Sequence, residues 1–157
     1  MAIMDVAWDD TRQIWCGHAV LDGIGRIEVA IVPKDVEPAV ARSYADFALP
    51  SLTTRLSEAR QYAAHRLLEY YNYYQAHLPD GAQVTDALFA GRLRLEGIRF
   101  RGEGAASLDF AHDLYQNDRL MAGGLVVVEC TAAGRFRRAS WMTEPDAQDA
   151  RRIRRCM

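Results

Sequence analysis

Alternating apolar and polar residues near the start of the chain predict a β-hairpin. Residues 14–32 form two such runs, separated by Asp-Gly and Ile-Gly pairs that suit a turn. In the second run Ile27, Val29 and Ile31 share one face. Pro33 ends this strand because it cannot donate a ladder hydrogen bond.

A period of three to four residues follows and predicts helices. A short helix is expected to begin at the cap Asp35 and to end near Phe47. A second short helix is expected from the cap Thr85 to about Gly91.

The strongest helical pattern lies between these two, at residues 51–78, and ends at the helix-breaking Pro-Asp-Gly of residues 79–81. Its apolar side chains recur at steps of three and four, which predicts one face buried on a sheet. The predicted stripe is Leu52, Leu56, Ala59, Ala63, Leu67, Tyr70, Tyr74 and Leu78.

The second half of the chain is rich in strand patterns. Four runs are expected to be strands, at residues 92–101, 106–113, 124–130 and 135–143. In the first of them the apolar face is continuous only if the pairing shifts at Glu96-Gly97, which predicts a β-bulge.

A hairpin, then helices, then consecutive antiparallel strands indicate an α+β fold. We expect a mostly antiparallel sheet of about six strands, with one long helix and one or two short helices packed on one face. The 157 residues suit a single domain, with an ordered core at about residues 14–143 and a tail at 144–157.

The composition is that of an ordinary globular protein, half apolar and a quarter charged. No run approaches the roughly 20 apolar residues of a membrane span, and the acidic N-terminus is unlike a secretory signal, so a cytoplasmic location is expected. Cys16, Cys130 and Cys156 lack the spacing of a zinc site and are expected to be reduced thiols.

The net charge of −2 conceals an uneven distribution. Four of the 19 basic residues lie in the last seven positions, so the preceding chain holds 15 basic and 21 acidic residues and a net charge of −6. An acidic body with a basic tail disfavours nucleic acid as a partner and favours a basic protein surface.

No motif for a metal, a cofactor or a catalytic nucleophile is present, so none of these is predicted. The best position for general acid/base chemistry is His112, which is expected to be accessible at a strand end. Adjacent residues of a strand point to opposite faces, so Asp113 is not positioned to assist it. An enzyme that uses His112 is therefore kept as an alternative.

A second alternative is nucleic-acid binding by arginines on two strands. Asp109 and Glu129 on the intervening strands are expected to neutralise this face by cross-strand pairing. The arginines concerned are Arg92, Arg94, Arg99, Arg101, Arg135 and Arg137.

The most unusual local feature is the YYNYYQ segment of the long helix, residues 70–75. Tyrosine is favoured at protein interfaces because it combines a large apolar ring with a polar end. The predicted partner-binding residues are Tyr62 and Tyr73, together with Glu69 from the charged side of the helix.

The segments WCGHAVLDGIGRIEVAIV, LLEYYNYY, LFAGRLRLEGIRF and GLVVVEC resemble, in this order, a family of small bacterial α+β domains that includes immunity proteins of polymorphic toxin systems. The resemblance covers about residues 14–143. Where relatives have Gly-His before the fifth strand, this chain has Gly123-Gly124. The resemblance implies an immunity-type protein that neutralises a cognate toxin by direct contact, and it assigns no catalytic residue.

Overall fold

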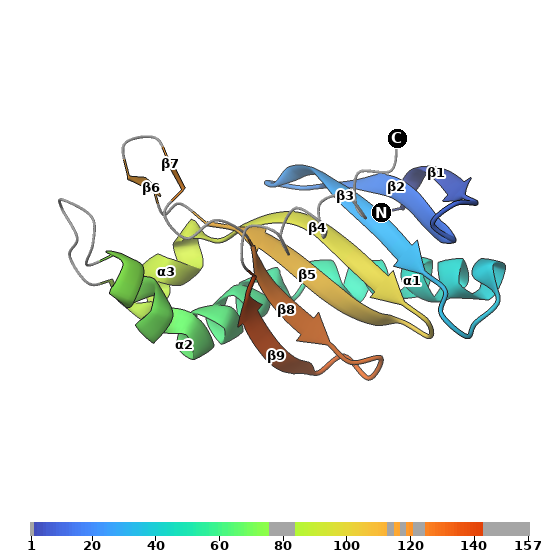
Figure 1. The fold of residues 1–157 in the computed structure, drawn as a ribbon. Coiled ribbons are helices and arrows are strands. Elements are labelled where there is room, and N and C mark those ends of the chain that lie inside the picture. The colour runs from blue at the N-terminus through green and yellow to red at the C-terminus, as the bar shows by residue number, and fades with distance from the viewer. Residues whose placement is uncertain (1, 76–83, 113–114, 117–118, 121–124, 143–157) are drawn as a thin grey trace.

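The computed structural model of the chain describes residues 2–75, 84–112, 115–116, 119–120 and 125–142. It shows an α+β fold in which one open sheet is covered on one face by helices (Figure 1). The predicted Pro-Asp-Gly stop, the end of the long helix and the C-terminal tail lie outside the described residues.

The main sheet has seven strands in the order β1-β2-β3-β4-β5-β8-β9. They are β1 (Met4–Asp9), β2 (Ile14–Leu21), β3 (Gly25–Val32), β4 (Arg94–Arg101), β5 (Ala105–Ala111), β8 (Val126–Cys130) and β9 (Phe136–Trp141). Two short strands, β6 (Tyr115–Gln116) and β7 (Arg119–Leu120), pair only with each other. All neighbours in the main sheet are antiparallel except β3 and β4, which are parallel because the helices connect them.

The predicted hairpin, the four later strands and the bulge are confirmed. The bulge lies between Leu95 and Gly97, where the pairing of β4 with β5 shifts. The edge strand β1 was not predicted, and the expected six strands are seven. The alternating pattern of β1 is interrupted, because Asp5 has a positive φ of 51° and the pairing of β1 with β2 is irregular between Met4 and Ala7.

Three helices lie on one face of the sheet: α1 (Pro38–Thr53), α2 (Leu56–Gln75) and α3 (Asp86–Arg92). Helix α1 packs on β2 and β3, whereas α2 packs on β8, β9 and α3 (Figure 1). The indole of Trp15 ties α1 to β2 by donating to the Pro38 carbonyl at 2.9 Å.

The boundary between α1 and α2 differs from the predicted one. Helix α1 continues through Pro50 to Thr53 and does not end near Phe47, and the long helix begins at Leu56. The first amides of a helix have no partner within the helix, so proline, which has no amide hydrogen, is common at a helix start. Pro50 therefore indicated a helix start at this position. The hydroxyl of Thr53 donates to the Pro50 carbonyl at 2.9 Å, and such bonds compete with helix hydrogen bonds and bend the chain.

Of the two predicted N-caps, the one on α3 is confirmed and the one on α1 is wrong. Thr85 caps α3, since its hydroxyl accepts a hydrogen bond from the Leu88 amide at 3.3 Å. Asp35 does not cap α1, because the N-cap is Glu37 and Pro38 follows as the first helical residue. Proline at this position removes one amide that a cap would otherwise satisfy.

The predicted α2 stripe is buried as far as Leu67 and then differs by one position. Leu56, Ala63 and Leu67 are buried, but Tyr70 is 62% exposed and Tyr71 is fully buried. Steps of three and four from Leu67 are both compatible with a helix, and α3 decides between them. The ring of Tyr71 stacks on Phe89 of α3 with centroids 4.1 Å apart, and its hydroxyl accepts from Arg92 at 2.5 Å.

The face of the sheet opposite the helices contains several buried polar side chains. Arg99 of β4 and Asp109 of β5 form an ion pair at 3.1 Å, with side chains only 7% and 0% exposed. His18 on β2 is also buried, and its ring nitrogen lies 3.4 Å from the exposed carboxylate of Asp5. A buried ion pair is expected to be costly to break by removing one partner.

The observed phase of α2 can be tested with two charge insertions. Leu67→Asp should unfold the domain, because an unpaired carboxylate in the core costs several kcal/mol of a total stability of about 5–15 kcal/mol. Tyr70→Asp should retain a native melting curve in circular dichroism, because that side chain faces solvent. A folded Leu67→Asp variant, or an unfolded Tyr70→Asp variant, would show that the helix has a different phase.

Candidate functional site

The three predicted partner-binding residues lie along one flank of α2, but they are not equally accessible. Glu69 is exposed and Tyr73 is 62% exposed. Tyr62 is half-buried, with its ring 5.9 Å from that of Phe136 and covered by Arg66 at 4.9 Å. Its hydroxyl is buried and has no hydrogen-bond partner among the described residues. Of the three predicted partner-binding residues, Glu69 and Tyr73 are thus exposed, whereas Tyr62 is half-buried.

His112 is not the accessible imidazole that the sequence predicts. The side chain is only 2% exposed, and its ring lies 4.5 Å from that of Trp141. It lines neither of the two cavities described below. The last strand places the large Trp141 ring over this strand end, and a single-strand pattern does not reveal such a cover.

The arginines do not form the single basic face that nucleic-acid binding requires. Arg92 belongs to α3 and not to a strand, and Arg99 is buried in its pair with Asp109. Arg137 pairs with Glu129 at 3.5 Å. The cross-strand neutralisation by Asp109 and Glu129 is confirmed.

The most exposed large apolar side chain of the described residues, Phe47, lies on α1. Val40, Tyr44 and Phe47 are 42%, 40% and 87% exposed and recur at steps of four and three. We call these three residues the outer stripe of α1. Phe47, Tyr44 and Val40 together form an exposed apolar patch, and contiguous patches of this kind mark interaction sites.

A cavity of about 250 Å³ opens beside the outer stripe. It lies between α1 and two turns of the sheet, one joining β4 to β5 and the other joining β8 to β9. Tyr44 and Phe47 form its helical wall, while Gly104 and Ala133 line it from the two turns. Gly104 has a φ of +103°, a conformation that side-chain-bearing residues rarely adopt. The result is a concave, largely apolar groove next to an exposed aromatic ring.

Arg55, at the junction of α1 and α2, holds the β8–β9 turn against this groove. Its guanidinium donates to the Gly134 carbonyl and lies over the Phe136 ring at 4.5 Å. It also donates two hydrogen bonds of 2.9 Å to Glu58. The hydrogen bond with Glu58 raises the pKa of Arg55 and lowers the pKa of Glu58, so the pair stays charged.

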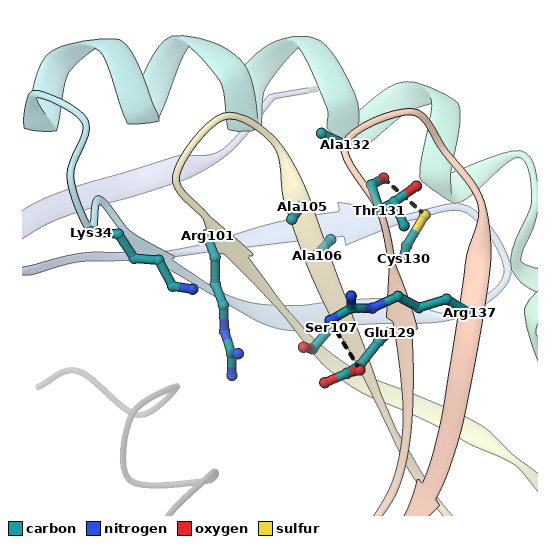
Figure 2. A pocket seen from close by; sticks show the side chains of 10 residues that line it. All are labelled: Lys34, Arg101, Ala105, Ala106, Ser107, Glu129, Cys130, Thr131, Ala132 and Arg137. Atoms are coloured by element: carbon teal, nitrogen blue, oxygen red, sulfur yellow. Dashed lines mark hydrogen bonds and ion pairs between the residues drawn. The ribbon is translucent and has the colours of Figure 1, made fainter.

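A second cavity, of about 230 Å³, lies on the sheet face opposite the helices. Figure 2 shows the basic side chains of Lys34, Arg101 and Arg137 around it, together with Ser107 and Glu129. The dashed line between Arg137 and Glu129 is their ion pair.

The cysteines differ from the expected three reduced thiols. Cys130 is a free, buried thiol, and burial raises its pKa above the ordinary value. Cys16 is disulfide-bonded. Distant spacing along the sequence does not reveal which cysteines a fold brings together.

Sequence reasoning missed the outer stripe of α1, although a signal was present. The segment contains two apolar stripes, of which only one can face a sheet. The inner one is Ala41, Ala45, Leu49 and Leu52, all buried. The outer one contains the larger side chains of Val40, Tyr44 and Phe47, which recur at the helical steps of four and three.

Comparisons of the chain with protein-family models, with curated proteins and with solved structures found no match. Among the described residues no helix is both long and apolar enough to cross a membrane. The same part of the chain contains no group of three or more histidine, cysteine, aspartate or glutamate residues placed to hold a metal.

The anchoring of the β8–β9 turn can be tested by removing the guanidinium. Arg55→Ala should lower the free energy of unfolding by about 2 kcal/mol, because it removes a hydrogen bond to a carbonyl and a cation–π contact. Arg66→Ala is the matched control, since Arg66 also covers a ring but has no hydrogen bond within the described structure. Urea denaturation would measure both, and equal effects would contradict the anchoring role.

Proposed function

We propose that this chain is a protein-binding domain that docks a partner on the outer stripe of α1 and the adjoining groove. The observation that carries the proposal is the 87% exposure of Phe47 beside a concave apolar wall. Interfaces draw most of their affinity from a few aromatic anchors near well-packed pockets. Tyr44 and Phe47 have the residue type and the position of such anchors.

The charges around the stripe support a basic partner. Asp46 and Glu37 are exposed on or next to α1, and Glu103 lines the groove. Of the nearby cations, Arg42 lies over the Trp15 ring and Arg55 is paired with Glu58. Exposed carboxylates around an apolar centre attract a basic surface and raise its association rate.

The finer proposal is that the partner is a bacterial toxin domain and that the chain neutralises it by covering its surface, as an immunity protein does. Support comes from the family resemblance of the strand and helix segments and from the acidic body. The exposed Tyr70 and Tyr73 on α2 form a second candidate patch, separated from the outer stripe along the sequence and on a different helix.

The docking surface can be tested by co-expressing the chain with the product of the neighbouring gene and measuring binding by titration calorimetry. Phe47→Ser should weaken the complex by about 2 kcal/mol or more, as loss of a central aromatic anchor does. Tyr73→Ser is the matched control, because it removes an exposed ring from α2. Raising the salt concentration should slow association, since screening acts on exposed charges.

A complex weakened by Tyr73→Ser and unaffected by Phe47→Ser would move the interface to α2. Within that outcome, Tyr73→Ala should cost more than Glu69→Gln, because carboxylates at a rim mainly affect the association rate. Absence of binding to the neighbouring gene product would contradict the toxin proposal.

The proposed location is the cytoplasm, and the state of Cys16 tests it. Disulfides are rare in a reducing cytoplasm, so a cytoplasmic location predicts that Cys16, which is disulfide-bonded in the structure, is reduced in growing cells. Cells quenched with acid and alkylated under denaturing conditions without reductant should therefore yield modified Cys16. Protection of Cys16, with Cys130 modified, would indicate an oxidising compartment.

A further inference from the structure

The cavity opposite the helices gathers cations from three separate elements. Arg101 is the last residue of β4, and Lys34 follows β3, the strand parallel to β4. Arg137 belongs to the edge strand β9. Figure 2 shows the charged ends of Lys34 and Arg101 extending in front of the sheet, with Arg137 reaching across β8 from the other side.

Two of these cations, Lys34 and Arg101, have no counter-charge among the residues that the structure describes. Among the described residues no carboxylate lies within ion-pair distance of Lys34 or Arg101, whereas Arg137 pairs with Glu129. The ionised side chains that line the cavity therefore carry a net charge of +2. Uncompensated cations in a concavity favour an anion, and the charge count favours a dianion.

Hydroxyl groups complete the lining. Ser107 lies on β5, and Thr131 follows β8. The Thr131 oxygen accepts a hydrogen bond from the Arg135 amide at 3.1 Å, which leaves its hydrogen available to donate. Phosphate oxygens accept hydrogen bonds from guanidinium, ammonium and hydroxyl groups, and all three kinds of donor line this cavity.

Lys34 is held in a conformation that lysine rarely adopts. Its φ is +54°, in the turn closed by the hydrogen bond from the Val36 amide to the Pro33 carbonyl at 3.1 Å. It is also the single lysine of the chain, beside 18 arginines. Strained backbone of this kind gathers at functional positions.

We propose that this cavity binds the dianionic phosphate group of a small phosphorylated molecule or of inorganic phosphate. Arg101 and Lys34 contact the phosphate oxygens, and Arg137 closes the site from β9. The volume of about 230 Å³ is below the roughly 300–1,000 Å³ of sites for drug-sized ligands, so the ligand is small. The site lies on the face opposite the outer stripe of α1 and is independent of the proposed partner.

Nuclear magnetic resonance titration of the isotope-labelled chain tests the site, with inorganic phosphate and glycerol 3-phosphate as probes. Both should give saturable shifts at the adjacent ends of β3 and β4. Tighter binding of glycerol 3-phosphate would assign the site to phosphate monoesters, and tighter binding of inorganic phosphate would assign it to the free ion. Affinity should fall as the pH is lowered through about 6, where a phosphate loses its second charge.

Three variants separate the site from general charge effects. Arg101→Gln and Lys34→Asn should each weaken binding about tenfold, as expected for a lost charge-assisted hydrogen bond. Asparagine tolerates a positive φ better than lysine does, so Lys34→Asn should fold at least as well as the parent and decides the matter if Arg101→Gln does not fold. Arg26→Gln, on an exposed arginine at the start of β3, should leave the affinity unchanged.

The proposal is overturned if neither phosphate gives saturable shifts, or if Arg26→Gln weakens binding as much as Lys34→Asn does. It is also overturned if acetate or dimethyl phosphate binds as tightly as glycerol 3-phosphate. Equal binding of the diester would point to a nucleic-acid backbone, which carries one charge for each phosphate.

Discussion

The helix-facing side of the sheet accepts one apolar stripe from each long helix, and this limit determines what remains on the surface. Helix α1 uses its small side chains, Ala41 and Ala45, to approach β2 and β3 closely. Its larger rings must then face solvent. Burying a phenylalanine stabilises a fold by about 1.5–3 kcal/mol, so the exposed Phe47 leaves that free energy available to a partner.

The bend between α1 and α2 places the groove beside those rings. A single straight helix could not cover both β2–β3 and β8–β9 of a twisted sheet. The threonine hydroxyls after Pro50 allow the change of direction, and Arg55 then fastens the β8–β9 turn to the bend. The same turn contributes to both cavities, through Thr131 and Ala132, although they open on different faces.

Strand patterns, the bulge at Gly97 and the α3 cap followed from the sequence because each depends on local periodicity or on one residue's conformational preference. Features set by tertiary contacts did not follow. The choice of Tyr71 over Tyr70 depends on Phe89, and the burial of His112 depends on Trp141. The two cavities join residues from strands and turns far apart in the chain, so no spacing in the sequence could reveal them.

The claim that the outer stripe of α1 is the docking surface is tested most directly by hydroxyl-radical footprinting of the chain alone and in its complex. In the isolated chain Phe47 and Tyr73 should both be oxidised rapidly, and Tyr71 should be protected. In the complex Phe47 should become protected while Tyr73 remains reactive. Continued oxidation of Phe47 in a complex that protects Tyr73 would contradict the account.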